Sequence, residues 1–584
     1  MKIIKIGVAV GVAFIAFAGM WYTISPVSFK SSAQKVPLYA SLSGAQGSVQ
    51  KMNDPFREVR ERGAAKEPAR SSITVDAAVS KGPLQHFWSG AGHDLFYENF
   101  SYIGARYLYL HLAKENKKGR FVKYWRSHNI FSDKDAPWQK DSGTQVYRLG
   151  EDGKPTYNWK KIDQVFDFIL AAGMTPIVEY GFMPELLTSD PKRIGDWGAA
   201  NVAPPKDYTL WRQLVEATTR HLRERYGKQV RSWYFEVWNE PDLYYHFWRE
   251  SAPGSNKTDI AEYLKLYDYT VAGIEDADPE LKIGGPAIAG DLGVMEAFLK
   301  HVDTGKNYVT GSVGSRLDFI SFHKYGNINE HVLPGTKNVI DKVLQVNRKR
   351  FGKLPVIVSE YGPTTTSKAN WKNEPYSAAW VAGTITGLLW LSDKYGPSYL
   401  PTGMVFWSAI GENFKGGSGM LGSHIIDGKL ETFARGPVLQ VFDMLSHLGN
   451  ERLQINGSKY GSPVHALATR GENGEYAVLL YRLRGRNSKG LKPVTIDLKL
   501  SEIRPGTYRR VEYTIDEKRN NPFAYLVKKG GPKNLGEEGF AMFEKLNKLL
   551  PDGPSEKLVL KDTFSAEISL SVNSVCLVLL TPEK

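Results

Sequence analysis

The sequence contains a single cysteine, Cys576, so the chain cannot form an internal disulfide bond. Cys576 lies in "SVCLVLL", an apolar run that is typical of a buried strand. This setting favours a packed core residue over a nucleophile or a metal ligand. The stability of the fold must therefore come from the burial of apolar side chains.

Patterns that are typical of nucleic-acid binding are also missing. Lys and Arg (75) exceed Asp and Glu (62) and give a net charge of +13. Even so, the chain has no run of five or more basic residues, no aromatic-basic RNA-binding pattern and no zinc-finger spacing. We therefore expect no nucleic-acid partner, and the positive charge leaves an anionic polysaccharide or a membrane surface as partners.

Length and composition indicate a large globular chain. With 584 residues and 42% hydrophobic content, it is long enough for two or three domains with cores of their own. The aromatic content of 12% suits a protein that binds sugar rings by stacking, although large side chains filling a core are an alternative explanation.

The amino terminus predicts export from the cytoplasm. The first five residues are basic at two positions, and residues 6–24 carry no charge. This stretch is either a signal peptide, with a cleavage site at Ala16-Phe17-Ala18, or a membrane anchor over residues 1–24. In both cases the body of the protein is periplasmic, secreted or anchored outside the cytoplasm. Residues 25–70 lack periodicity and are rich in small and basic residues, which predicts a flexible linker.

Between residues 71 and 449 the chain alternates short apolar runs with amphipathic stretches. The runs are nearly continuous in hydrophobicity, as expected for parallel strands that are buried on both faces. Eight of them can be recognised: residues 84–88, 105–111, 174–180, 232–238, 281–286, 317–323, 354–360 and 403–408. Amphipathic helices fit between them, so we expect a (β/α)8 TIM barrel.

After residue 450 the hydrophobic period changes to two, which predicts an antiparallel β-sandwich domain over residues 450–584. One helix is expected near residues 536–550. Residues 71–79 also read as a strand, and this strand is a candidate for sharing with the sandwich.

Two carboxylates follow strands on nearly opposite sides of the predicted barrel. Glu240, in "WNEP", follows the fourth strand, and Glu360, in "SEYGP", ends the seventh. The carboxyl ends of all barrel strands converge on one pocket, so these side chains can face each other. We expect Pro241 to keep the backbone of Glu240 extended. Two opposed carboxylates are what the cleavage of a glycosidic bond requires, and Asn239 is placed to contact the sugar 2-hydroxyl.

The chain resembles glycoside hydrolase family 39, the β-xylosidases and α-L-iduronidases within the 4/7 barrel clan. The residues behind this resemblance are "FEVWNEPD" (235–242), "IDQVFDFILAAGMTPIVEYGFMPE" (162–185), "RLDFISFHKYG" (316–326), "VSEYGP" (358–363) and "GGSGMLGS" with "GPVLQVFDMLSHLG" (416–449). The resemblance implies a retaining glycosidase in which Glu240 is the acid/base and Glu360 the nucleophile. It implies no metal and no cofactor.

Other residues at the rim of the predicted barrel are candidates for substrate binding, and the resemblance supports His111 and Tyr325 among them. His111 would end the second strand and contact sugar hydroxyls, although a hydrogen-bonded core histidine is an alternative. His323 and Tyr325 would end the sixth strand, and in this clan a tyrosine at this position commonly forms a hydrogen bond with the nucleophile. Trp407 ends the eighth strand as a stacking floor or as a core residue. The remaining candidates are the loop residues Glu412 and Phe182.

Tyr325 argues against a terminal iduronate as the substrate. The iduronidases carry a lysine at this position, and that lysine binds the carboxylate of the sugar. The remaining substrates are xyloside-, galactoside- and arabinoside-type linkages, and loops such as residues 125–141 decide among them. The net charge keeps an anionic polymer among the candidate substrates. Two alternatives to a hydrolase remain, a membrane-tethered barrel that binds carbohydrate without cleaving it and a transglycosylase of polysaccharide processing. The sequence does not indicate an oligomeric state.

Overall fold

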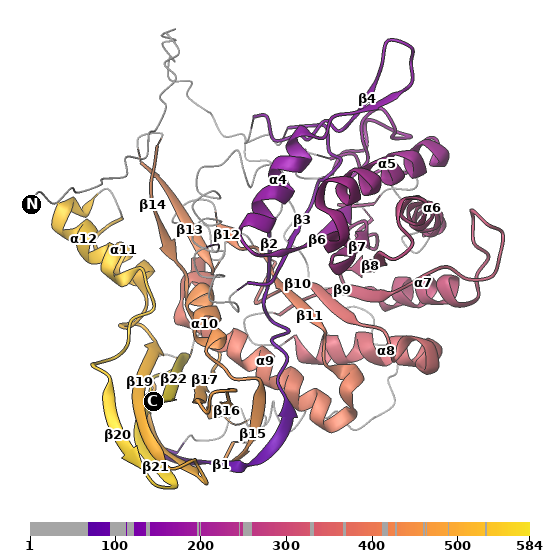
Figure 1. Ribbon diagram of the computed structural model, residues 1–584. Coiled ribbons are helices and arrows are strands. Elements are labelled where there is room, and N and C mark those ends of the chain that lie inside the picture. Colours follow the sequence, from indigo (N-terminus) through magenta and orange to yellow (C-terminus); the bar gives the residue numbers. More distant parts are fainter. Residues whose placement is uncertain are drawn as a thin grey trace, which may run out of the picture. The chain divides into compact units, whose positions relative to one another are not determined.

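A computed structural model gives the fold of most of the chain after residue 67. It describes residues 68–93, 113, 122–135, 140–195, 198, 200–244, 246–248, 260–326, 332–365, 370–411, 419–426, 429–458, 462, 464–486, 488, 490–531 and 534–583. These residues form a closed parallel barrel and a nine-stranded sheet (Figure 1). The predicted fold class, a TIM barrel with an accessory sandwich, is confirmed.

The barrel closes through parallel pairing of each strand with its neighbours, the last strand pairing with the first. Its strands are β2 (Gly90–His93), β3 (Tyr124–Ser127), β6 (Thr175–Tyr180), β7 (Tyr234–Val237), β8 (Lys282–Ile288), β9 (Phe319–Tyr325), β10 (Val356–Gly362) and β11 (Gly403–Phe406).

Helices cover the outside of the barrel. They are α4 (Lys160–Ala171), α5 (Tyr208–Tyr226), α6 (Ala261–Ala277), α7 (Leu292–Thr304), α8 (Leu333–Phe351), α9 (Pro375–Tyr395) and α10 (Pro437–Ser446). Helix α5 shows why these segments are helical. The Asp207 side chain caps its first turn, the apolar face from Trp211 to Leu222 is buried, and Gly227 follows it with φ 65°.

The first two predicted strands differ from the structure. The first barrel strand is β2, which begins two residues after the predicted segment 84–88. The predicted second strand, residues 105–111, lies outside the described residues, and β3 occupies the position between β2 and β6 in the closed barrel. Strand β3 has only four residues, and one of them is the charged Arg126, which faces the barrel interior and binds carboxylates there. A short strand with a buried charge lacks the continuous apolar pattern that we used to recognise strands.

Short elements complete the barrel. They are the hairpin of β4 (Tyr147–Leu149) and β5 (Pro155–Tyr157), the three-stranded sheet of β12 (Ile410–Gly411), β13 (Leu421–Ile426) and β14 (Lys429–Arg435), and the 3-10 helices η1 (Gly227–Ser232), η2 (Asn370–Asn373) and η3 (Pro397–Tyr399).

The nine-stranded sheet contains the strands after residue 450 and one strand that precedes the barrel. The later strands are β15 (Glu451–Asn456), β16 (Val464–Arg470), β17 (Tyr476–Arg482), β18 (Val494–Ser501), β19 (Gly506–Ile515), β20 (Glu556–Leu560), β21 (Thr563–Leu570) and β22 (Ser574–Pro582). Strand β1 (Arg70–Pro83) lies between β15 and β18, parallel to β18 and antiparallel to β15. The sheet folds over a core that joins Phe564 of β21 to Val578 of β22, although these strands lie far apart in the sheet order.

Two helices, α11 (Pro522–Lys528) and α12 (Gly536–Leu546), lie between β19 and β20 in the chain. The prediction of a helix near residues 536–550 corresponds to α12, and α11 was not predicted. Cys576 is buried in β22, and burial raises the pKa of its thiol to about 12, so the thiol is unreactive.

The sheet packs against helix α9 of the barrel. The hydroxyl groups of Thr386 and Tyr481 lie 2.5 Å apart, and Arg452 binds Asp393 at 2.9 Å. Apolar residues of β17 and β22 belong to the same buried cluster as the barrel core.

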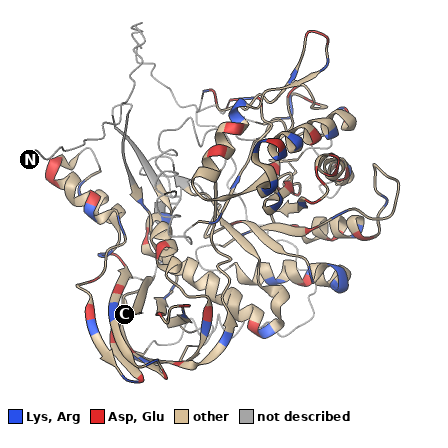
Figure 2. Cartoon of the chain, in the orientation of Figure 1, with Lys and Arg blue, Asp and Glu red and all other residues tan. Residues whose placement is uncertain are grey.

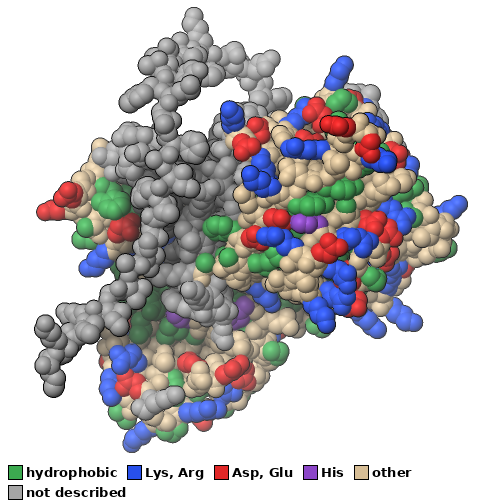
Figure 3. All heavy atoms as spheres, turned by 45° about the horizontal axis from the view of Figure 1, so that its top comes forward, with side chains coloured by type: hydrophobic (Ala, Val, Ile, Leu, Met, Phe, Trp, Pro, Cys, Tyr) green, Lys and Arg blue, Asp and Glu red, His purple; other side chains and the backbone are tan. Residues whose placement is uncertain are grey.

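Lys and Arg as well as Asp and Glu residues occur along the barrel helices (Figure 2). On the face in Figure 3, Lys and Arg alternate with Asp and Glu over the described surface, and the net positive charge is not gathered into one field there. Among the described residues no helix is both long and apolar enough to cross a bilayer, and the apolar stretch 6–24 lies outside them.

Candidate active site

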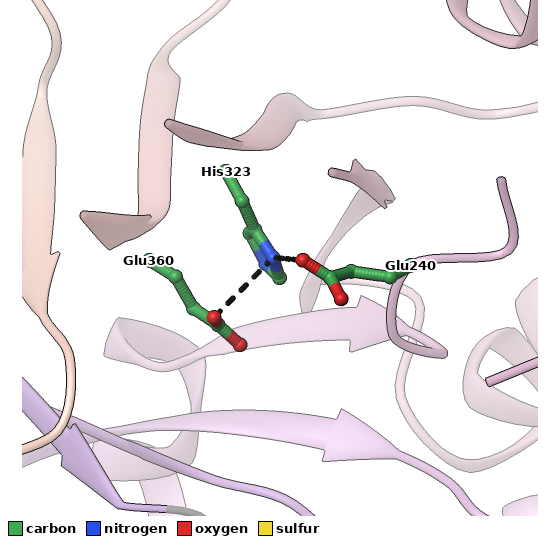
Figure 4. Close-up of side chains that lie close together, drawn as sticks. All are labelled: Glu240, His323 and Glu360. Carbon is green, nitrogen blue, oxygen red and sulfur yellow. Dashed lines mark hydrogen bonds and ion pairs between the residues drawn. The ribbon is translucent and has the colours of Figure 1, made fainter. Parts of the chain in front are cut away.

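Glu240 and Glu360 meet at the carboxyl end of the barrel. Glu360 is part of β10, and Glu240 lies three residues beyond the end of β7. The side chains converge on His323 of β9, as Figure 4 shows, and one oxygen of each carboxylate and one ring nitrogen all lie within 4.8 Å of one another. Both glutamates are largely buried, with exposed fractions of 7% and 4%. Two residues 120 positions apart in the chain therefore share one small space.

The backbone at Glu240 is not extended, so our expectation for this residue was wrong. Its φ is 44°, in the left-handed region, and Trp238 has φ 67°. The following proline disfavours the right-handed helical region for Glu240, but Glu240 does not take the extended conformation that usually replaces it. Two backbone hydrogen bonds hold these residues in the strained left-handed conformation. The Glu240 amide donates to the Ala287 carbonyl at 3.0 Å, and the Trp238 amide donates to the Tyr180 carbonyl at 3.2 Å.

Three groups surround the carboxylate of Glu360. Arg126 donates from Nη1 to Oε1 at 2.8 Å, and His128 Nε2 lies 3.2 Å from the same oxygen. Tyr325 donates its hydroxyl proton to Oε2 at 2.6 Å. His323 lies farther away, with Nδ1 at 3.5 Å from Oε2. Both oxygens of Glu360 are therefore held in a fixed orientation.

Glu240 has a different environment. Its Oε1 lies 2.7 Å from Nδ1 of His323, and no arginine or lysine contacts it among the described residues. Burial lowers the pKa of His323 to about 3, so this ring is neutral near pH 7. A neutral imidazole can form a hydrogen bond with a carboxylic acid without adding a positive charge that would stabilise the carboxylate.

The two environments shift the pKa values of the carboxyls in opposite directions. Burial raises the pKa of Glu240 well above its ordinary value, and the charge of Glu360 adds to this effect. Burial opposes ionisation of Glu360 too, but His323, His128 and Arg126 outweigh it and hold its pKa well below the usual range. Since His323 is neutral near pH 7, we attribute the ionisation of Glu360 at that pH to Arg126 and His128. The site therefore favours the protonated form of Glu240 and the ionised form of Glu360.

Asn239 is oriented by Arg126. The guanidinium can only donate, and its Nη2 donates to Asn239 Oδ1 at 2.9 Å, so the amide nitrogen must face the other way. That nitrogen is buried and has no hydrogen-bond partner among the described residues. Asn239 thus presents a free donor beside Glu240.

Aromatic rings form a wall next to the carboxylates. Trp407, which is 7% exposed, lies with its ring 4.7 Å from that of His128. Phe182 is fully buried and contacts His128 and Phe247, at 6.0 and 5.8 Å between ring centres. Gly92 makes room for Trp407, because a Cβ there would lie 2.3 Å from the indole ring.

The group of Glu240, His323 and Glu360 has the residue types of a metal site, but its chemistry does not favour one. Arg126 already binds Oε1 of Glu360, and a bound cation would be repelled by that guanidinium. Burial and the charge of Glu360 raise the pKa of Glu240, which favours its neutral acid form, and a neutral carboxylic acid is a poor ligand.

The predicted site residues that the structure describes are brought together, and two are not described. Asn239, Glu240, His323, Tyr325, Glu360, Trp407 and Phe182 lie in or beside this site. His111 and Glu412 lie outside the described residues. Sequence reasoning missed Arg126 and His128, because "WRSH" was interpreted as part of a loop. The available signal was an Arg and a His two positions apart directly after the apolar pair Tyr124-Trp125.

A family model described as glycosyl hydrolases family 39 matches residues 71–554. The chain belongs to this family. The match covers the barrel and most of the sandwich, and it confirms the resemblance seen in the sequence. Because the curated relatives in the family are glycosidases, the chain is a glycoside hydrolase that acts on carbohydrate.

The relatives include two β-xylosidases. One, from Caldicellulosiruptor saccharolyticus, is 29% identical over 75% of this chain and 86% of its own length. The other, from Geobacillus stearothermophilus, is 30% identical over 68% of this chain and 77% of its own length. An α-L-iduronidase from Homo sapiens is 25% identical over 54% of this chain and 45% of its own length.

Among solved structures, the chain is similar to a monomeric β-xylosidase from Caulobacter crescentus. The TM-score is 0.69 at 25% sequence identity, and the match covers 88% of this chain and 100% of that one.

Proposed function

We propose that this family 39 enzyme is a retaining glycosidase that works by double displacement. Glu360 attacks the anomeric carbon and forms a covalent glycosyl-enzyme, while Glu240 protonates the leaving oxygen. The supporting observation is the distance between the carboxylates. Retaining enzymes hold the two carboxyls about 5–5.5 Å apart, and inverting enzymes about 6.5–9.5 Å apart. Here one oxygen of each carboxylate lies within 4.8 Å of the other.

The charges of the two carboxyls suit these roles. In the first step Glu360 loses its negative charge as the ester forms, and Glu240 gains one as it gives up its proton. The net charge of the site is unchanged. Once Glu360 is esterified it no longer repels a charge on Glu240, so the pKa of Glu240 falls. Glu240 can then act as the base that takes a proton from the attacking water.

We further propose a neutral terminal sugar of the xyloside, galactoside or arabinoside type. Tyr325 donates to Glu360 where the iduronidases carry a lysine. The two cations of the described site, Arg126 and His128, already bind carboxylates of the protein. Neither is available for a substrate carboxylate. The relatives called β-xylosidases make a xyloside the first substrate to test.

The test compares Glu240→Gln and Glu360→Ala with the wild type on aryl β-xylosides, other aryl glycosides and polysaccharides. Wild-type hydrolysis followed by proton NMR should give a first product with the anomeric configuration of the substrate. Both variants should lose activity, the acid/base variant by about 10²- to 10⁴-fold on a poor leaving group. Initial formation of the inverted anomer would contradict double displacement. Wild-type inactivity on all substrates would favour a carbohydrate-binding barrel.

We propose that residues 6–24 direct the protein out of the cytoplasm, as a cleaved signal or as an anchor. The observation behind this is the uncharged stretch after a basic start. Mass analysis of the mature amino terminus after expression in a bacterial host tests it. Cleavage after Ala18 supports a signal peptide, and an intact chain in the membrane fraction supports an anchor. An intact chain in the cytoplasm would contradict both.

A further inference from the structure

Glu179 of β6 connects the two cations that contact the nucleophile. Its side chain is fully buried, and its Oε2 lies 2.8 Å from Nη2 of Arg126 and 2.6 Å from Nδ1 of His128. The other ring nitrogen of His128, Nε2, lies 3.2 Å from Oε1 of Glu360. The imidazole of His128 therefore lies between two carboxylates, that of Glu360 on the substrate side and that of Glu179 on the opposite side.

This arrangement determines the proton content of the ring. Each ring nitrogen faces a carboxylate oxygen, and an imidazole can donate from both nitrogens only when it is an imidazolium. The rings of Trp407, Phe182 and Phe247 lie 4.7, 6.0 and 6.1 Å from His128 and limit its rotation. Burial lowers the pKa of His128, but the charge and hydrogen bond of Glu179 outweigh this and raise it to about 10.

The other charged groups that face His128 cannot take over the role of Glu179 in keeping the ring protonated. Glu360 also favours the imidazolium, whereas the charge of Arg126 opposes it. His323, on the far side of Glu360, is neutral near pH 7. Glu360 loses its charge when the glycosyl-enzyme forms, and Glu179 is then the only carboxylate that His128 contacts within the described site.

Glu179 also balances the charge behind the nucleophile. Arg126 and His128 carry two positive charges, and Glu179 and Glu236 carry two negative ones. These four charges cancel, which leaves the negative charge of Glu360 available for the reaction. Without Glu179, either the buried cations would be in excess or His128 would lose its proton.

We propose that Glu179 is a positioning residue of the reaction, which acts through His128 by holding a doubly hydrogen-bonded imidazolium on Oε1 of Glu360. This inference rests on the glycosidase function proposed above. Glu179 itself does not touch the sugar in this account. Its role is to fix the orientation and the protonation of the ring that does contact the nucleophile.

The test uses Glu179→Gln, with Glu236→Gln as the matched control. Both changes remove one buried negative charge and keep the side-chain shape. Glu236 binds Nε of Arg126 at 2.6 Å and has no bond to His128 in the described structure. The first readout is a carbon NMR titration of His128 in full-length protein labelled at histidine, assigned by the peak that is lost in His128→Asn. It needs no substrate.

In the wild type we expect His128 to stay protonated through pH 9. In Glu179→Gln the pKa of His128 should fall from about 10 to about 7–9, since the loss of an adjacent opposite charge moves a pKa by about 1–3. In Glu236→Gln it should stay near the wild-type value. The second readout is kcat/KM against pH on an aryl glycoside. A new ionisation near that of His128 should appear in Glu179→Gln alone, with kcat about 10- to 100-fold lower.

Each outcome decides the proposal. A wild-type His128 that is neutral at pH 8 would overturn it, even if Glu179→Gln fails to fold. A titration of His128 that is the same in Glu179→Gln as in the wild type would overturn it too, whatever the activity. Wild-type inactivity on every glycoside would remove the proposed function, but the link between Glu179 and His128 would still be measured by the titration.

Discussion

At the scale of single residues, two identical side chains are made into an acid and a nucleophile by their neighbours. Glu360 accepts from Arg126 and Tyr325, and both contacts favour its ionised form. Among the described residues, the Glu240 carboxyl has a side-chain hydrogen bond only with the neutral ring of His323, and it is buried beside another negative charge. The division of roles between the carboxyls is therefore a property of their environments.

The raised pKa of Glu240 predicts the alkaline limb of the pH profile. Glu240 must be protonated to act as the acid, so kcat/KM should fall as pH rises through its pKa. In Glu240→Gln this limb should disappear, and the loss of activity should be much smaller on a 2,4-dinitrophenyl glycoside than on an alkyl glycoside. Steady-state kinetics between pH 4 and pH 9 on both substrates measures this. An unchanged alkaline limb in the variant would contradict the role of Glu240.

Tyr325→Phe removes the hydroxyl that donates to Oε2 of Glu360. A hydrogen bond to a charged group contributes about 1.5–3 kcal/mol, so we expect kcat/KM to fall about 10- to 100-fold. The pKa of Glu360 should rise, because its ionised form loses a donor, and the acid limb of the profile should move to higher pH. A profile that keeps its acid limb would show that Tyr325 does not act on Glu360.

At the scale of elements, the sequence predicted those strands that lie in long, mostly apolar runs. β7 and β10 were recognised because "SWYFEVW" (232–238) and "LPVIVSE" (354–360) are mostly apolar and lead into the motifs that carry Glu240 and Glu360. β3 was missed because its Arg126 faces the barrel interior and is stabilised by Glu236 and Glu179 from other strands. A buried charge can be recognised only together with its partners, and these lie 53 and 110 positions away in the chain. His128 was missed for the same reason.

The packing of β2 against β11 gives a prediction at this scale. In Gly92→Ala the new Cβ would lie 2.3 Å from the ring of Trp407, so the indole must move. Because a displacement of about 1 Å in a site can reduce the rate about 100-fold, we expect kcat/KM to fall about 10- to 100-fold. Gly290→Ala is the control, since nothing lies within 4 Å of a Cβ there. Equal activity of the two variants would show that Trp407 does not need its position.

At the scale of the whole molecule, the sheet depends on a strand from before the barrel. β1 pairs with β15 on one side and β18 on the other, so it contributes hydrogen bonds and core residues to a sheet whose other strands follow residue 450. Alternation of apolar residues indicated that residues 71–79 form a strand, but its two partners depend on how the chain returns after the barrel. A local pattern of apolar residues does not specify which distant strands will pair.

Ile73→Ala tests the contribution of β1 to the core of the sheet. Ile73 is 1% exposed, and truncation of a buried isoleucine costs about 2–5 kcal/mol. Val79→Ala, on the same strand but 44% exposed, should change the stability by less than about 0.5 kcal/mol. Urea denaturation followed by circular dichroism compares the two midpoints. Equal midpoints would show that β1 is not needed by the sheet core.

The net charge of +13 leads to a prediction about salt. Charges of both signs are interspersed on the surface in Figure 3, so a neutral substrate should not be attracted by a single field. We expect kcat/KM on a neutral aryl glycoside to change less than about 2-fold between 0.05 and 0.5 M NaCl. A KM for a sulfated or uronic polysaccharide that rises steeply over the same range would instead favour an anionic polymer as the substrate.

The assignment of Glu360 as the nucleophile is tested most directly by mass spectrometry. The protein is reacted with a 2-deoxy-2-fluoro-β-xyloside that carries a dinitrophenyl leaving group, and the masses of the protein and of its peptides are measured. The fluorine slows release of the covalent intermediate, so the wild type should gain the mass of one fluorosugar, with the label on the peptide that contains Glu360. Glu360→Ala should gain nothing. A label on Glu240, or a wild type that releases dinitrophenol without gaining mass, would contradict the assignment of Glu360 as the nucleophile.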